Sequence, residues 1–277
     1  MFATNALSGF GSGGVTVYEK LIDAITTVGI TSGLQICLDA GDENSYTSGD
    51  KWLDVSGNGY DFHRGLTSST DGQEMTFNGT PGDITKNEYF YSTGNDMFRY
   101  DSANETWMES LHKDGAKFCW FTVAYYPAGV GAFSSYGTRW DNPAIESSVN
   151  AAQKQSIGVP PSVFTVTADN VVPNDQWICH AHSIDDNGGD VSFLWINGGY
   201  DQVSSANTFN AAYSSPSSSA AGGLFGLCCG GGVSFNSNGY WPNGARVGCI
   251  AWWSGTIPTK ANLDSLYAII GPRFGIS

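Results

Sequence analysis

Charged residues are scarce in this chain of 277 residues. They make up 14% of it, against about 25% in an average soluble domain. Basic residues are the scarcest, because 12 Lys and Arg stand against 26 Asp and Glu, for a formal net charge of −14. Nucleic acids and anionic membranes are bound by clustered Lys and Arg. We therefore expect no nucleic-acid partner, and the low charge also argues against long solvent-exposed helices.

Long hydrophobic runs are missing as well. The sequence contains no stretch of 18 apolar residues, so it predicts no transmembrane helix and no membrane insertion. The residues from Met1 to Asn5 lack the basic and apolar segments of a secretory signal peptide, and we expect no such peptide.

The cysteines follow neither a metal motif nor a regular disulfide framework. They occupy positions 37, 119, 179, 228, 229 and 249, without a C-x-x-C pair. Cys119, Cys179 and Cys249 lie within apolar runs, where a free cysteine behaves as a small hydrophobe. We interpret all six mainly as reduced core residues, with disulfides as the alternative for a protein that matures outside a cell.

Glycine and aromatic residues are abundant, with 36 Gly, 15 Phe, 13 Tyr and 9 Trp. Aromatic and β-branched runs bounded by Gly, Asn, Asp or Pro predict strands. These runs are Leu34–Asp39, Glu88–Ser92, Lys117–Tyr126, Val163–Ala168, Gln176–Ile184, Val191–Ile196 and Arg246–Trp253. The Ser- and Ala-rich segment Ser204–Gly223 predicts a long surface loop. Together these patterns predict an all-β fold, a two-sheet antiparallel sandwich.

Peripheral helices are expected in three places. Thr16 and Glu19 form a potential capping box ahead of an apolar stripe that ends at Gly29. Ser102–His112 and Thr259–Ile270 show similar patterns. We therefore divide the chain into residues 1–33, an N-terminal arm with a short amphipathic helix, and residues 34–277, the sandwich. The apolar stripe of the helix needs a surface that covers it, either the chain's own β-domain or a neighbouring subunit. We expect the arm to act as an anchor through Phe10, Tyr18, Leu21, Ile22 and Ile25.

The motifs of residues 34–276 resemble a known family. The runs Leu34–Asp42 and Lys51–Gly59, with the segments LDAGD and W-x-D-x-S-G-N-G, resemble the opening of laminin-G-like, concanavalin A-like jelly rolls. This version is common in proteins of tailed bacteriophages. Later blocks agree in order with the family, and they are Tyr89–Phe98, Phe118–Val123, Gln176–Gly198 and Gly248–Trp253. The resemblance implies a lectin-glucanase type of jelly roll, a fold that hosts lectins, hydrolases, adhesins and structural modules.

The resemblance implies two kinds of ligand site. Laminin-G-like domains often bind calcium in rim loops, and Asp39, Asp42, Asp54 and Asn58 offer hard oxygen ligands. The alternative for these residues is turn chemistry, and no other cofactor is expected. A carbohydrate site needs exposed aromatic residues beside short polar ones. The candidates for it are Tyr136, Trp140, Asp141, Tyr240 and Trp241. The alternative for these loop residues is packing against neighbouring loops or a partner subunit.

Catalytic patterns are not found. A retaining glucanase of this fold needs two carboxylates about 5 to 5.5 Å apart, and related enzymes place them in an E-x-D-x-x-E strand pattern that this sequence lacks. Glu105 and Glu109 fall on an expected helix, and no G-x-S-x-G elbow occurs. His180 and His182 share one face of a strand, with a metal pair as the alternative to sheet hydrogen bonds. We expect no catalytic residues and no enzyme.

Three function classes remain open. The first is a structural protein of a phage virion, such as a head-decoration, fibre, neck or tail accessory protein, assembled in the host cytoplasm. Its partners would be other virion proteins and sister subunits. The second is an adhesin that binds host-surface glycans, and the third is a glycan-cleaving hydrolase, which the missing carboxylate pattern disfavours. We expect the first class, because low charge and many aromatic residues suit surfaces buried by symmetric neighbours.

Overall fold

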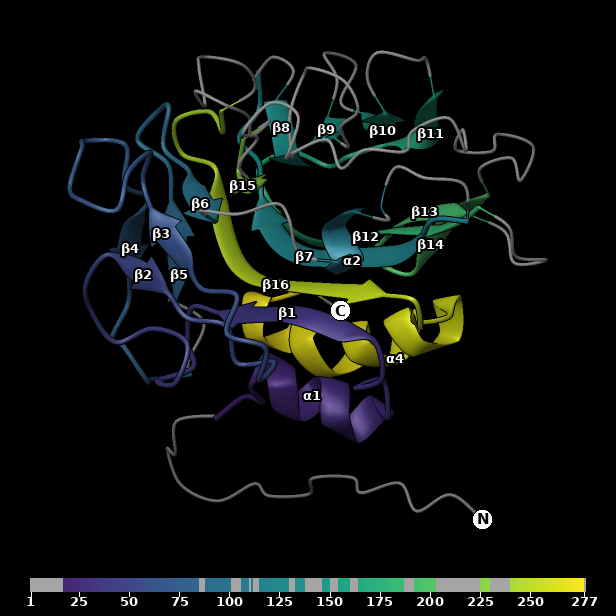
Figure 1. Ribbon diagram of the computed structural model, residues 1–277, viewed down its shortest axis with the longest axis horizontal. Coiled ribbons are helices and arrows are strands. Elements are labelled where there is room, and N and C mark those ends of the chain that lie inside the picture. Colours follow the sequence, from purple (N-terminus) through teal and green to yellow (C-terminus); the bar gives the residue numbers. More distant parts are fainter. Residues whose placement is uncertain are drawn as a thin grey trace.

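The fold was obtained as a computed structural model of the whole chain. The structure describes residues 17–84, 88–100, 106–109, 111, 115–129, 133–137, 146–149, 154–159, 164–186, 192–202, 225–229 and 240–276. These residues form three layers, namely two antiparallel β-sheets stacked on each other and a layer of helices on the outside of one sheet (Figure 1). The all-β sandwich expected from the sequence is confirmed.

Sheet A is the middle layer. In spatial order it contains β14 (Gly199–Gln202), β13 (Phe193–Ile196), β12 (Trp177–Asp185), β7 (Lys117–Tyr125), β16 (Arg246–Ser254), β5 (Tyr89–Tyr91) and β4 (Thr76–Asn78). The strand β1 (Leu34–Asp39) pairs with the later part of β16, whereas β5 pairs with its first two residues. Every pairing in this sheet is antiparallel.

Sheet B faces the inner side of sheet A. Its order is β11 (Phe164–Val171), β10 (Lys154–Val159), β9 (Glu146–Val149), β8 (Phe133–Gly137), β15 (Phe225–Leu227), β6 (Phe98–Tyr100), β3 (Phe62–Arg64) and β2 (Lys51–Trp52). Between the two sheets lies an inner core of aromatic and aliphatic side chains that includes Trp52, Phe98, Trp120 and Trp252. Strand alternation explains this core, because every second residue of a strand points to the same face.

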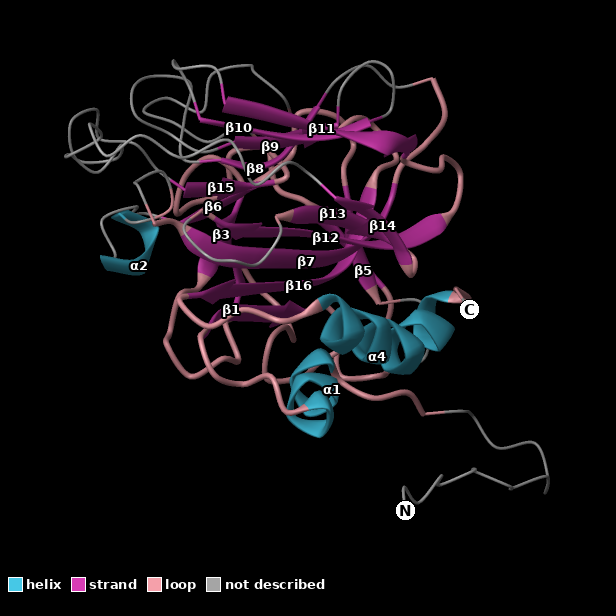
Figure 2. Ribbon diagram, turned by 90° about the vertical axis from the view of Figure 1, so that its right-hand side faces the viewer, coloured by secondary structure: helices cyan, strands magenta, loops and turns pink. Residues whose placement is uncertain are grey.

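Helices α1 (Leu21–Val28) and α4 (Lys260–Ile270) cover the other face of sheet A (Figure 2). The side chains between them and the sheet form an outer core that includes Cys119, Phe121, Trp195, Trp253 and Leu266. The sandwich therefore has hydrophobic packing on both faces of sheet A, which explains why β7, β12 and β16 are buried along nearly their whole length.

The helix of the predicted anchor packs in this outer core, against the sandwich of its own chain. Leu21 and Ile25 are fully buried against sheet A and α4, because the apolar stripe finds its partner within the chain. Tyr18 and Ile22 are half-buried. Phe10 lies outside the described residues. The boundary at residue 33 thus falls inside one packing unit.

Helix ends differ in detail from the sequence expectations. Helix α1 begins after Lys20, which makes no side-chain cap, whereas a start at Thr16 was expected. Thr259 caps α4 through a reciprocal pair of hydrogen bonds with Asn262. At the predicted stop, Gly271, the chain continues as a short 3₁₀ helix, η1 (Gly271–Phe274). Within the range expected as Ser102–His112, α2 spans Thr106–Glu109.

Candidate functional site

A row of large side chains crosses one end of sheet A on its outer face. Trp177 is paired with Tyr125, Tyr125 with Arg246, and Arg246 with Tyr91. Directly paired residues of antiparallel strands project to the same side. Tyr89, two positions before Tyr91, shares that face. These five residues, from β12, β7, β16 and β5, are called the aromatic row.

The rings of the aromatic row gather around Arg246. Its guanidinium carbon lies 4.4 Å from the ring centroid of Tyr125 and 5.1 Å from that of Tyr89. The Trp177 ring lies 5.6 Å from Tyr89 and 6.1 Å from Tyr125, both edge to face. All five side chains are half-buried, so each keeps part of its surface in contact with solvent. The arrangement offers apolar ring faces beside a cation.

Phe274 of η1 packs against Trp177, which lies at one end of the aromatic row. Its ring lies 4.8 Å from that of Trp177. A side chain at Gly248 would overlap the Phe274 ring, and Gly248 sits at the bulge between Val247 and Cys249 where β16 pairs with β7. Glycine at this position therefore allows Phe274 to approach the sheet and pack against Trp177.

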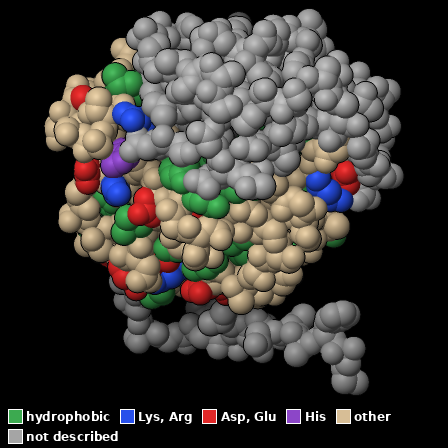
Figure 3. Space-filling view, viewed as in Figure 1, with side chains coloured by type: hydrophobic (Ala, Val, Ile, Leu, Met, Phe, Trp, Pro, Cys, Tyr) green, Lys and Arg blue, Asp and Glu red, His purple; other side chains and the backbone are tan. Residues whose placement is uncertain are grey.

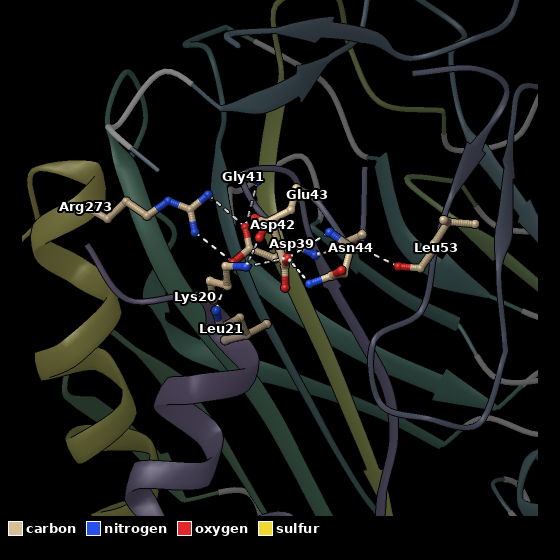
Figure 4. A network of polar contacts seen from close by, with 10 residues as sticks. Lys20, Leu21, Asp39, Gly41, Asp42, Glu43, Asn44, Leu53 and Arg273 are labelled. Carbon is tan, nitrogen blue, oxygen red and sulfur yellow. Dashed lines mark hydrogen bonds and ion pairs between the residues drawn. The ribbon is translucent and has the colours of Figure 1, made fainter. Parts of the chain in front are cut away.

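A buried ion pair holds η1 in place (Figure 4). Arg273 Nη2 lies 2.7 Å from Asp39 Oδ1, and Nη1 donates to Oδ2 at 2.8 Å. Both side chains are fully buried. Burial by itself raises the pKa of Asp39, but the Arg273 guanidinium outweighs it and holds that pKa below its usual value. Burial likewise opposes the charge of Arg273, yet Asp39 keeps the pKa of the guanidinium raised.

The same carboxylate ties the start of α1 to the sheet. The backbone N–H groups of Leu21 and Gly41 each donate to Asp39 at 2.9 Å. Beside them Lys20 forms ion pairs with Asp42 at 3.0 Å and Glu43 at 2.7 Å (Figure 4). Asp39 thus joins the beginning of α1, the end of β1 and the C-terminal η1.

The four predicted calcium ligands make contacts within the chain. Asp39 and Asp42 face Arg273 and Lys20, and Asp54 accepts hydrogen bonds from the N–H groups of Cys37, Ser56 and Tyr60. The Asn58 side chain donates to the carbonyls of Leu34 and Gln35. Asp39, Asp42 and Asp54 also each accept a hydrogen bond from the backbone N–H group two residues further on, which is the turn chemistry expected as the alternative. Calcium binding at the four residues stays a prediction. Among the described residues no group of three or more His, Cys, Asp or Glu could hold a metal ion.

The predicted carbohydrate-binding residues lie in different environments. Trp241 is 1% exposed and packs 5.3 Å from Tyr126 in the inner core, so it offers no binding surface. Tyr240 is half-buried against Met97 and Cys229. Tyr136 lies on β8, paired with Leu227. Trp140 and Asp141 lie outside the described residues.

The two strand histidines point into the inner core. His180 Nε2 lies 2.9 Å from the Tyr126 hydroxyl, and its Nδ1 contacts the Gln155 amide. His182 Nδ1 lies 3.0 Å from the Ser147 hydroxyl. Burial lowers the pKa of His180 to about 3 and holds that of His182 well below its usual value. Both rings are therefore neutral partners in hydrogen bonds between the sheets. All six cysteines are buried and none is in a disulfide.

The sequence reasoning missed the aromatic row. None of its five residues was among the predicted site residues, and Trp177 is half-buried on the outer face of sheet A. The alternation of Tyr89, Phe90 and Tyr91 was the available signal, since it places two tyrosines on one face. Which strands would lie beside them depends on register, which a single sequence does not give.

Comparisons with known proteins find similarity in three-dimensional structure but none in sequence. No protein-family model matches the chain, and no curated protein matches it in sequence. A sialidase from Trypanosoma rangeli, solved with sialic acid, is similar with a TM-score of 0.55 and 11% identity over 89% of this chain and 34% of that one. The chain thus spans about a third of the length of the sialidase.

Two other solved structures are also similar. Domain 4 of a GH43 extracellular arabinanase from Geobacillus stearothermophilus, solved with arabinotriose, has a TM-score of 0.52 and 14% identity over 84% of this chain and 97% of that one. The binding domain of botulinum neurotoxin DC, solved with rat synaptotagmin II, has a TM-score of 0.56 and 7% identity over 86% of this chain and 52% of that one. The chain shares a β-sandwich fold with them. At these identities the likeness shows the fold alone.

The sialidases overturn one sequence expectation. The missing carboxylate pattern predicted that the chain is not an enzyme, but structures similar over most of its length are sialidases. The prediction is therefore wrong, because a β-sandwich similar to this one also forms part of sialidase chains. On the surface of the protein, the face drawn in Figure 3 shows acidic and basic side chains scattered over its described part.

Proposed function

We propose that the chain is a lectin-like domain that binds a glycan at the aromatic row. The observation that carries the proposal is the set of half-buried rings of Trp177, Tyr125 and Tyr89 around the Arg246 guanidinium. Sugars present apolar C–H faces that pack on aromatic rings, and hydroxyl groups that accept hydrogen bonds from a guanidinium. The row spans four strands, or three strand spacings of about 4.8 Å each, which suits an oligosaccharide.

The way the row is held supports binding rather than packing alone. Phe274 supports Trp177 from below, and the Asp39–Arg273 pair fixes the turn that carries Phe274. A binding surface gains affinity when its side chains are already ordered before the ligand arrives. The described residues therefore provide an ordered platform whose outer ring surfaces remain open to solvent.

A glycan array probed with the labelled full-length chain tests this proposal. We expect binding to at least one glycan class, and the Trp177→Ala variant should weaken it about tenfold, or about 1.4 kcal/mol, with little change in fold. The matched control is Trp107→Ala, which removes another half-buried tryptophan, one that packs on Tyr60 and Trp252 away from the row. Equal losses in both variants, or no binding at all, would contradict the proposal.

The resemblance of Leu34–Asp42 and Lys51–Gly59 to tailed-phage proteins supports a second part of the proposal. In it the chain is a structural component of a phage virion that displays this sandwich, and the glycan is one on the host surface. Its partners are other virion proteins and sister subunits. Mass spectrometry of gradient-purified particles should detect the chain in structural amounts, and its absence from intact particles would contradict this role.

A further inference from the structure

The guanidinium of Arg246 differs from the other arginines that the structure describes. Arg64 donates to the Met75 carbonyl, Arg99 to the Leu66 carbonyl, and Arg273 to Asp39. Arg246 makes cation–π contacts with two tyrosines, but it donates no hydrogen bond and joins no ion pair within the described part of the chain. Its N–H donors are left for water or a ligand.

The charge balance of the chain makes this unusual. Acidic residues outnumber basic ones 26 to 12, so a cation has many potential partners. Lys20, Lys117 and Lys260 each pair with an aspartate at 3.0 Å or less. Arg246 instead rests on rings that orient it without neutralising its charge.

An oriented, unneutralised guanidinium suits one ligand chemistry above others. Its planar fork of N–H donors matches a carboxylate, with two parallel hydrogen bonds that are shorter and stronger than neutral ones. The rings of Tyr125 and Tyr89 contact the guanidinium, and Tyr91 is paired with Arg246 on the neighbouring strand. The Trp177 ring adds apolar surface next to these two tyrosines. A sugar that carries a carboxylate would place its charge at Arg246 and a ring face against the neighbouring aromatics.

We propose that Arg246 makes the aromatic row selective for acidic glycans, in which a sugar carboxylate binds the guanidinium. This inference rests on the proposed glycan binding and names its ligand class. The aromatic rings favour such a ligand over a simple anion, because only the sugar has an apolar face that can pack against them while its carboxylate binds Arg246. The charge distinguishes it from a neutral glycan, which would leave the half-buried guanidinium without a counter-charge.

The test uses matched pairs of probes that differ only in the carboxylate. These are trigalacturonic acid with its methyl ester, and 3′-sialyllactose with its methyl ester, titrated calorimetrically into the full-length chain. In at least one pair the acid should bind about tenfold more tightly or better, and added salt should reduce that difference. Arg246→Gln should remove the preference and Arg246→Lys should keep part of it, whereas Trp177→Ala should weaken the acidic and the neutral form alike.

The outcomes separate this inference from the proposed function. Equal binding of both members in both pairs, or a preference that survives in Arg246→Gln, overturns acidic selectivity while leaving glycan binding in place. A pentaglutamate peptide that binds as tightly as the acidic sugars also overturns it, since the carboxylate alone would then suffice. If none of the probes binds and the glycan array is blank as well, the proposed function itself fails.

Discussion

Arg273 and Asp39 lie 234 positions apart in sequence, yet the guanidinium and the carboxylate meet at 2.7 and 2.8 Å with no exposure to solvent. Asp39 also accepts a hydrogen bond from the first residue of α1. One carboxylate therefore joins the N-terminal helix, the edge strand β1 and the turn that supports Trp177. The stability of the fold and the order of the aromatic row share this contact.

Replacing one partner of this pair should be costly. Arg273→Met leaves the Asp39 carboxylate buried without its counter-charge, and breaking a buried pair from one side costs about 3 to 5 kcal/mol. Denaturant unfolding measures the loss. The control is Lys260→Met, which removes the exposed pair with Asp264 on α4 and should cost about 0.5 kcal/mol or less. Similar losses in the two variants would show that the buried pair is not a principal support.

Helix α1 should prove necessary for folding. Ile25 is fully buried in the outer core and Ile22 only half-buried. We expect Ile25→Ala to lower the free energy of unfolding by about 2 to 5 kcal/mol, and Ile22→Ala by clearly less. Deleting residues 1–30 should yield an unstable or insoluble chain, because sheet A would lose part of its cover. A truncated chain with an unchanged thermal midpoint would disprove the assignment.

A side chain at Gly248 should destabilise the fold because the Phe274 ring occupies the space it would need. A Cβ at Gly248 overlaps the Phe274 ring, so Gly248→Ala should cost about 1 to 3 kcal/mol by overpacking. In a Phe274→Ala background the overlap is gone and the same substitution should cost much less. A double-mutant cycle measures this coupling. Additive losses would mean that the close approach of ring and strand is not the cause.

Stability should fall in acid because of the buried histidines. The pKa of His180 is about 3 in the fold against 6.5 as its ordinary value, and that of His182 is also depressed. Between these values the unfolded chain binds more protons than the folded one, so the free energy of unfolding falls as the pH falls from about 6.5. Each ring contributes up to about 1.4 kcal/mol per pH unit.

Two substitutions isolate this effect. His180→Gln places an amide near the Nε2 position that contacts Tyr126, and His182→Asn places one near the Nδ1 position that contacts Ser147. The double variant should lose most of the pH dependence between about pH 3 and 6.5, measured by urea unfolding at several pH values. His63, a half-buried histidine on β3, provides the control in His63→Gln. An unchanged slope in the double variant would reject the explanation.

The strands with strong hydrophobic signals were predictable, and the polar ones were not. Lys117–Tyr125 and Arg246–Ser254 are rich in aromatic and apolar residues because both faces of sheet A are covered. Glu146–Val149 and Lys154–Val159 carry serine, glutamine and glycine, and they became strands through pairing with their neighbours in sheet B. Local propensity does not report such pairing.

The candidate site was harder to predict for a related reason. Each member of the row lies on or at the edge of a strand that the sequence predicts, but the row exists only because four strands from different parts of the chain share one register. Trp241 shows the opposite failure. A loop-like sequence around it suggested an exposed aromatic, whereas its ring fills the space beside Tyr126. Burial in a loop depends on tertiary packing, which turn residues do not reveal.

The place of β16 in sheet A also has a consequence for synthesis on the ribosome. β16 separates β7 from both β1 and β5, although it is formed by residues 246–254. Until those residues emerge, β1 has no partner in the sheet and β7 presents one open edge, and such edges pair readily with other chains. Chaperone binding to the nascent chain should therefore persist until β16 has left the exit tunnel and then fall in a single step.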